Sequence, residues 1–488
     1  MTEIIYENWE PIIGLEIHVQ LNTKTKLFSK APNSFGDEPN TNIAHVDTGQ
    51  PGSLPVLNKE AVKKAVMFGC AINAEIPYFS KFDRKSYFYP DSPRNYQITQ
   101  FDQPIIKGGT VIADVEGTTK TFYVNRAHLE DDAGMLKHFS DFAGVDYNRA
   151  GVPLLEIVSE PCMFSPKDAA AYATTIKAIM QYIGASDCNM EEGSLRIDVN
   201  ISVRKKGETG FRNKVEIKNM NSFSNMEMAL ESEIRRQIRE YSLRPEEDPA
   251  LVVPQSTFRF DLEKKQTILM RTKEEAADYR YFPEPDLPPI VLTKAFIDEI
   301  KENLPELPHE RFDRYTKKLE LSEYNASLLV SDKALSDYFE TGLSYCKNAK
   351  ALCNWITVEF VGRIKDSGKT LPEFGIPSKH IGELVDLIDN GTVTGKIAKS
   401  IADEMVKSPA KPPAQIIEEN PDFKPMNDVS AIESLVDQVI AENPESVAAF
   451  HSGKDKAYHF LFGQIMKLCK GKASPHIVKD LLSKKLQS

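Results

Sequence analysis

Residues 195–203 alternate strictly between apolar and polar side chains, the pattern of a β-strand with one buried face. Residues 214–218 repeat the alternation, and the intervening residues 204–213 include Gly207 and Gly210, so we predict a β-hairpin. One face of this hairpin carries five polar side chains: Arg196, Asp198, Asn200, Glu216 and Lys218. Such a face is either an ordinary solvated surface or the floor of a site.

A second strand of the same design is predicted over residues 12–21. Its apolar residues alternate with Glu16, His18 and Gln20. Side chains two positions apart on a strand project in parallel, about 7 Å apart, so Glu16 and His18 can serve one metal or phosphate site. Two strands of this kind in one chain favour a functional site over a solvated surface.

Three further segments concentrate polar side chains. HLEDDAG (128–134) sets three acids beside a histidine, which fits either a metal ligand set or a solvated turn. Residues 145–161 place four charged residues around a short apolar run, Asp146, Arg149, Glu156 and Glu160. Residues 81–100 mix four basic residues with five aromatic rings and prolines. That segment is either a loop that holds phosphates and stacks bases or a proline-pinned loop with its rings packed inward.

The composition is typical of a soluble protein, and a length of 488 residues is enough for about three domains. No apolar run is long enough to span a membrane, and six cysteines without a CxxC pair indicate reduced thiols in a cytosol. The net charge of -11 argues against a generally basic nucleic-acid binder. From residue 452 onward, however, the chain has eight lysines and only two aspartates, a local charge of +6. This charge indicates either a nucleic-acid contact or a surface whose lysines only aid solubility.

The pattern along the chain predicts an α+β protein. A mainly antiparallel-sheet domain is expected over residues 1–292, with helices that follow the N-cap residues Asn58 and Ser165 and a long helix over 221–241. An all-α domain is expected over 293–408 and a small all-α tail domain over 428–488. Five prolines between residues 409 and 425 predict a linker over 409–427.

Eight ordered motifs identify a family resemblance: GLEIHVQL, PGSLPVLN, FDRKSYFYPDSPRNYQITQ, HLEDDAG, GVPLLEIVSEP, MEEGSLRIDVNISV, VEIKNMNSF and DYRYFPEPDLPP. Together they closely resemble the B-subunit family of the bacterial aspartyl/glutamyl-tRNA amidotransferases. The tail's FGQIMKLCKGKASP also resembles that family's C-terminal domain, so the resemblance covers essentially the whole chain.

The resemblance implies a catalytic cradle domain, a helical domain and a tail domain that contacts tRNA. It also implies a carbon–nitrogen ligase reaction, in which ATP phosphorylates the side-chain carboxylate of Glu-tRNA(Gln) or Asp-tRNA(Asn) and ammonia then displaces the phosphate. Ammonia would come from glutamine on an amidase-type subunit, within a cytoplasmic heterotrimer that includes a small third subunit. No serine- and glycine-rich amidase signature occurs in this chain, so it should not hydrolyse glutamine alone.

The resemblance also implies roles for individual residues. Five residues match the family's metal-binding positions: Glu16, His18, Glu130, Asp198 and Glu216. Mg²⁺ suits their oxygen ligands, and the histidine leaves Mn²⁺ open. Glu130, Arg196 and Lys85 are expected to be catalytic, and Arg84, Lys218 and Asn200 to bind the nucleotide or the acceptor end.

One departure from the family concerns zinc. The family often has a CPVC tetrapeptide before the PGSLPVLN motif, as part of a zinc site, and the two cysteine positions are Ala44 and Asp47 here. We therefore expect no zinc. Two other interpretations remain open at this stage: a tRNA-binding scaffold whose partners do the chemistry, and an unrelated metal-dependent phosphotransferase that acts without tRNA.

Overall fold

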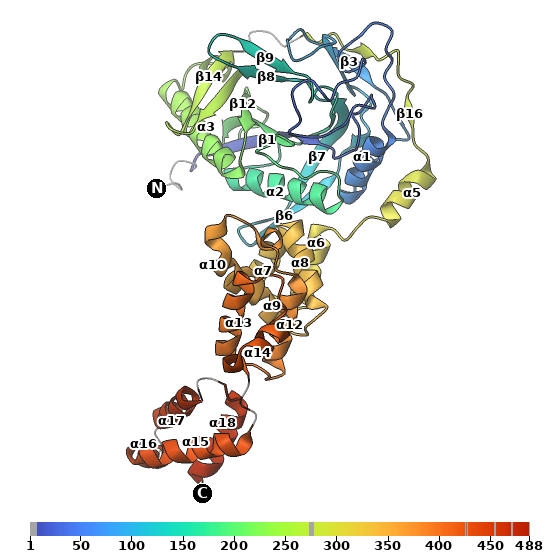
Figure 1. Ribbon diagram of the computed structural model, residues 1–488. Coiled ribbons are helices and arrows are strands. Elements are labelled where there is room, and N and C mark those ends of the chain that lie inside the picture. The colour runs from blue at the N-terminus through green and yellow to red at the C-terminus, as the bar shows by residue number, and fades with distance from the viewer. Residues whose placement is uncertain are drawn as a thin grey trace. The chain divides into compact units, whose positions relative to one another are not determined.

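The computed structural model describes residues 7–272, 278–424, 426, 428–452, 455–469 and 472–487. The chain forms two compact units, residues 1–311 and 312–488 (Figure 1). The predicted α+β class is confirmed, since strands dominate the first unit and helices the second. No helix of the described segments has the length and apolar character needed to cross a membrane.

A nine-stranded sheet organises the first unit. Its strands follow the order β14-β13-β12-β11-β1-β10-β7-β5, and β6 pairs with β7 beside this path. Their bounds are β1 Trp9–Gln20, β5 Ile106–Lys107, β6 Thr110–Val115, β7 Thr118–Asp131, β10 Pro153–Ser159, β11 Leu195–Lys205, β12 Val215–Met220, β13 Ser256–Asp261 and β14 Gln266–Thr272. Neighbours in this sheet run antiparallel, apart from the parallel pair β12 and β13. The predicted hairpin is confirmed as β11 and β12.

Helices cover one face of the sheet, so that its other face is left for polar side chains (Figure 1). The helices of this unit are α1 Lys59–Ala71, α2 Pro166–Tyr182, α3 Phe223–Leu243, α4 Pro249–Val252 and α5 Lys294–Glu302. Asn58 and Ser165 cap α1 and α2 as predicted, because their side chains accept backbone N–H bonds from the first turns. Alternate residues of β1, Leu15, Ile17 and Val19, pack into the core beneath the helices.

Small sheets surround the polar face. They pair β3 Asp83–Ser86 with β4 Tyr96–Thr99 and β15 Phe282–Pro283, β2 Phe79–Ser80 with β16 Ile290–Val291, and β8 Met135–His138 with β9 Ala143–Asp146. Residues 81–100, expected to be a loop, therefore contain two strands. Phe82 packs inward, whereas Phe88 and Tyr89 are exposed, so neither loop interpretation describes the whole segment.

The second unit begins with a helical bundle. Its described helices are α6 Pro308–Lys317, α7 Glu323–Val330, α8 Lys333–Leu343, α9 Ala349–Asn354, the π-helical turn η2 Trp355–Phe360, α10 Val361–Ile364, η3 Lys365–Ser367, α11 Leu371–Phe374, α12 Ser378–Asp389, α13 Gly395–Lys407, α14 Pro413–Glu419 and η4 Pro421–Phe423. The prediction of a linker over 409–427 is wrong for the middle of that segment. Helix α14 occupies its middle, and Ile416 packs into the core of the bundle. Pro413 lies in the first turn of α14, where a missing N–H costs nothing.

Four further helices enclose a core of their own: α15 Val429–Glu442, α16 Pro444–His451, α17 Asp455–Leu468 and α18 Pro475–Gln487. They correspond to the predicted tail. Of its eight lysines, Lys454 and Lys470 lie outside the described residues. Lys472 pairs with Asp422, and Lys485 pairs with Glu433 and Asp437, so the local positive charge is partly compensated.

One domain boundary differs from the predicted one. The first compact unit extends to Arg311 instead of residue 292, because Ile300 of α5 and Leu307 pack into the core of the sheet domain. The division of the second unit into a helical domain and a tail stays a prediction that its two separate cores favour.

Candidate functional site

Antiparallel register places polar side chains from four strands in one row across the open face of the sheet. His128 on β7 lies opposite Glu156 on β10, Glu156 opposite His18 on β1, and His18 opposite Arg196 on β11. The neighbouring row includes Glu16 opposite Asp198. Alternation on each strand sends these side chains away from the core, so the face predicted from the sequence exists and spans more strands than predicted.

Two residues of the first row, His18 and Glu156, form a cluster with Glu130 of β7 that can hold a metal ion. One ligand atom from each of His18, Glu130 and Glu156 lies within 4.8 Å of the others. His18 Nε2 is 3.3 Å from Glu156 Oε2, and Thr99 Oγ1 donates a 3.1 Å hydrogen bond to Glu130 Oε2. Both carboxylates are largely shielded from solvent. Two carboxylates and an imidazole at this separation fit a divalent cation such as Mg²⁺ or Mn²⁺.

His128 supports the cluster from β7, the strand that also carries Glu130. Its Nε2 lies 3.4 Å from Glu156 Oε2 and 3.6 Å from Glu130 Oε2, and its buried Nδ1 has no hydrogen-bond partner among the described residues. Burial alone would lower the pKa of His128, but the two carboxylates outweigh it and raise the pKa to about 9. Burial opposes ionisation of Glu156, yet His128 and His18 hold the pKa of Glu156 well below its ordinary range.

Lys85 faces this anionic cluster. Burial disfavours its charge, but Glu130 and Glu156 together raise the pKa of Lys85 above its ordinary value. Its Nζ lies 5.0 Å from the centre of the Tyr279 ring, and Tyr281 stacks on Phe101 with ring centres 4.1 Å apart. The charged ammonium is thus held near the carboxylates by β3 and by an aromatic wall.

The other predicted metal residues form a second group along the same face. Lys218 Nζ lies 2.9 Å from Asp198 Oδ2 and 2.8 Å from Glu216 Oε1. Glu16 accepts a 2.8 Å hydrogen bond from Asn200. The structure therefore separates the five predicted ligands, with His18 and Glu130 in the cluster and Asp198 and Glu216 around a lysine ammonium.

The predicted phosphate-binding arginines already have carboxylate partners. Arg84 donates to both oxygens of Glu284, at 2.7 and 2.9 Å, and its guanidinium lies 4.3 Å from the centre of the Tyr96 ring. Arg196 donates a 2.8 Å hydrogen bond to Asp132. Arg84 therefore joins β3 to the segment after β15, while Arg196 remains on the open face beside His18.

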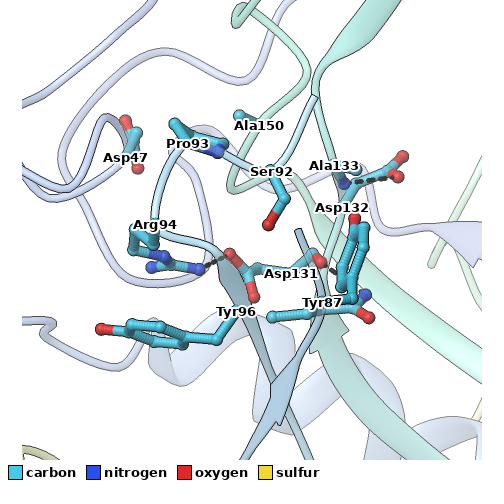
Figure 2. A pocket seen from close by; sticks show the side chains of 11 residues that line it. Asp47, Tyr87, Ser92, Pro93, Arg94, Tyr96, Asp131, Asp132, Ala133 and Ala150 are labelled. Atoms are coloured by element: carbon cyan, nitrogen blue, oxygen red, sulfur yellow. Dashed lines mark hydrogen bonds and ion pairs between the residues drawn. The ribbon is translucent and has the colours of Figure 1, made fainter. Parts of the chain in front are cut away.

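The acids of HLEDDAG are buried, so the interpretation of this motif as a solvated turn is wrong. Asp132 accepts hydrogen bonds from Gln20 and Arg196. Asp131 lines a small pocket, where it forms an ion pair with Arg94 (Figure 2). Burial outweighs that arginine and raises the pKa of Asp131 to about 6.

The five predicted metal ligands include neither Glu156 nor His128, although the motif that contains His128 was interpreted as a possible ligand set. For His128 a signal existed, because Arg126, His128 and Glu130 alternate with the core residues Ala127 and Leu129. For Glu156 there was none, since Leu154 and Leu155 on its N-terminal side are both apolar and hide the alternation. The pairing of β10 with β1 and β7 brings Glu156 into the centre.

An open sheet face with a carboxylate and histidine cluster, flanked by a lysine, fits one class of protein: an enzyme subunit that acts on anionic groups. Comparison with known proteins then gives the family. A family model described as the GatB/GatE catalytic domain matches residues 11–298, and one described as the GatB domain matches residues 337–486. The chain belongs to the GatB/GatE family.

Relatives match the chain over its full length. The B subunit of the aspartyl/glutamyl-tRNA(Asn/Gln) amidotransferase from Protochlamydia amoebophila strain UWE25 is 64% identical, covering 99% of this chain and 97% of the relative. The B subunits of the same enzyme from Chlamydia trachomatis serovar A and Chlamydia pneumoniae are 60% and 58% identical, each with 98% of both chains covered. The catalytic-domain match includes all the residues of the cluster.

Proposed function

We propose that this chain is the B subunit of a glutamine-dependent amidotransferase that converts misacylated Glu-tRNA(Gln), Asp-tRNA(Asn) or both into the amidated forms. The observation that carries the proposal is identity of 58–64% over the full length of proteins with this name. The proposal locates the chemistry at the cluster of His18, Glu130 and Glu156, and the position of these residues inside the matched catalytic domain supports it.

The reaction has a simple chemical logic. Ammonia cannot displace oxide from a carboxylate, so the side-chain carboxylate first attacks the γ-phosphorus of ATP and releases ADP. Ammonia then attacks the acyl carbon, inorganic phosphate leaves, and the nitrogen loses its extra proton. A divalent cation supplies neutralisation of the phosphoryl charge in such transfers. His18, Glu130 and Glu156 would hold this cation, with Glu16, Asp198 and Glu216 along the same face as further candidates.

Cationic side chains then have the task of holding oxyanions. Lys85 is placed for this role, because its ammonium is charged and faces the cluster without a carboxylate within ion-pair distance among the described residues. Arg196 keeps a position on the open face beside His18, although Asp132 shares its charge. Lys218 and Asn200 would contact the nucleotide or the acceptor end from the neighbouring row, whereas the contacts of Arg84 with Glu284 favour a structural role.

Partners complete the enzyme. The proposal includes an amidase-type subunit that releases ammonia from glutamine, a small third subunit, and a cytoplasmic location. It also includes the absence of zinc, since Ala44 and Asp47 supply no thiolate.

The test is amidation by the assembled enzyme with ammonium chloride as the nitrogen donor. Glu156→Gln keeps the volume of the side chain but removes the charge at the centre of the cluster, so we expect loss of amidated tRNA by at least about a hundredfold. Glu160→Gln is the matched control, because Glu160 contacts Asn125 away from the cluster. A chain that served only as a tRNA-binding scaffold would keep full activity in Glu156→Gln, and that result would refute the proposed function.

A further inference from the structure

Arg126 projects from the same face of β7 as the metal cluster. Arg126, His128 and Glu130 alternate with Ala127 and Leu129, which are buried in the core. Arg126 lies opposite Val158 of β10, and Val158 lies opposite Glu16 of β1. The guanidinium therefore belongs to the row of side chains next to the one that holds His128, Glu156 and His18.

The hydrogen-bonding capacity of Arg126 is largely unused. A guanidinium has five N–H donors, and the contact found for Arg126 is a long hydrogen bond of 3.3 Å from Nη1 to the carbonyl of Phe101. Its Nε is buried and has no partner in the described part of the chain. Within those same residues Arg126 makes no ion pair, whereas Arg196 on β11 and Lys218 on β12 of the same sheet each contact a carboxylate.

A buried guanidinium nitrogen without an acceptor is costly unless a ligand supplies one. Phe101, whose carbonyl accepts from Arg126, stacks its ring on Tyr281 at the wall of the cluster. The free donors of Arg126 are thus next to the space where the proposed reaction brings a triphosphate and a carboxylate together. Both groups are oxyanions, which a guanidinium binds with charge-assisted, frequently bidentate hydrogen bonds.

We propose that Arg126 is an oxyanion-binding residue of the site that positions one of the two reacting anions. This inference rests on the proposed function. The anion is either the γ-phosphate of ATP or the side-chain carboxylate of the aminoacyl group, and the two sources share the chemistry that Arg126 recognises. Arg126 acts beside the metal cluster and is not one of its ligands.

Steady-state kinetics of the assembled enzyme with ammonium chloride can separate the two sources. If Arg126 binds the triphosphate, Arg126→Gln should raise KM for ATP by about tenfold or more and weaken direct ATP binding equally. If it binds the carboxylate, the same change should appear in KM for the aminoacylated tRNA, while affinity for uncharged tRNA stays the same. Arg126→Lys should recover part of the loss in either case, because it restores the charge but not the fork of donors.

Controls make the result specific. Arg204→Gln is the matched variant, since Arg204 lies on the same sheet but is satisfied by Glu10 and the carbonyl of Gly210. Thermal unfolding of each variant checks folding, and Arg126→Lys carries the test if Arg126→Gln does not fold. The inference is overturned if kcat and both KM values of the Arg126 variants stay within about twofold of Arg204→Gln, a difference too small for a lost charge-assisted hydrogen bond. Glu156→Gln in the same assay separates the two failures, because full activity there would refute the proposed function itself.

Discussion

Replacing Asp47 with alanine should destabilise the first unit strongly, because it leaves a buried ammonium without its counter-charge. Lys26 Nζ lies 3.5 Å from Asp47 Oδ2, and the two side chains are 0% and 2% exposed. Asp47 also accepts hydrogen bonds of 2.9 Å from the Ala44 amide and 3.0 Å from Ser29 Oγ. Lys26 keeps one other acceptor, the Tyr147 carbonyl at 3.2 Å. The pair thus connects three loops of the first unit.

The magnitude follows from the burial. Removing one partner of a buried ion pair costs about 3–5 kcal/mol, since the remaining charge stays desolvated. For a unit of this size that corresponds to a fall in Tm of roughly 5–10 °C. Burial lowers the pKa of Lys26, and Asp47 is the main group opposing this effect. Without Asp47 the amine therefore loses its proton more readily, so the penalty should be larger at pH 6 than at pH 9.

Thermal unfolding followed by circular dichroism measures this effect. Lys26→Met combined with Asp47→Ala should recover most of the lost stability, because replacing a whole buried pair with apolar groups is often neutral. Lys167→Ala is the matched control, since its ion pair with Glu116 is exposed and should leave the transition unchanged. If Asp47→Ala and Lys167→Ala unfold at the same temperature at both pH values, the buried pair does not stabilise these loops.

Three further outcomes can be measured directly. In the metal-free protein the pKa of His128 is raised to about 9, so protonation of His128 stabilises the folded state fully below the ordinary pKa of 6.5, and this stability is lost as the pH rises through about 9. Urea titrations across this pH range should show the loss in the unaltered protein but not in His128→Gln. An unchanged dependence of stability on pH in His128→Gln would contradict the prediction. Metal analysis of the purified chain should show no stoichiometric zinc, because Ala44 and Asp47 offer no thiolate, and one tightly bound zinc per chain would show that other ligands replace them. Truncation after residue 425 should raise KM for tRNA and weaken the salt dependence of that KM, while amidation at saturating tRNA survives. Equal KM values and equal salt dependence in the truncated and full-length proteins would mean that the tail lysines are only a solvated surface. Two of these lysines, Lys472 and Lys485, already have acidic partners.

The sequence predicts the strands of the site well, because one buried face imposes strict alternation. The bounds of β1 and β11 differ from those of the predicted segments by at most three residues. Helix starts at Asn58 and Ser165 were predictable for a similar reason, since the capping side chain and the first turn are adjacent in sequence. The residues of one short segment were therefore sufficient to predict both the strands and the helix starts.

What the sequence could not predict depends on contacts between distant segments. Register across β7, β10 and β1 selects Glu156 as the partner of His18, although nothing near Glu156 marks it. Side-chain pairing likewise places Lys218 between Asp198 and Glu216. Helix α14 was missed because its prolines indicated a linker, whereas burial of Ile416 in the bundle stabilises a helix there.

We propose that His18, Glu130 and Glu156 hold the divalent cation used in phosphoryl transfer. The most direct measurement combines Mn²⁺ titration, followed by electron paramagnetic resonance, with release of ADP that depends on misacylated tRNA in the absence of any ammonia source. We expect the unaltered assembled enzyme to bind Mn²⁺ and to release ADP. We expect His18→Gln and Glu156→Gln to lose the tight Mn²⁺ site and the ADP release together, while Glu160→Gln keeps both. Normal Mn²⁺ affinity and normal ADP release in Glu156→Gln would contradict the assignment of this cluster as the metal site.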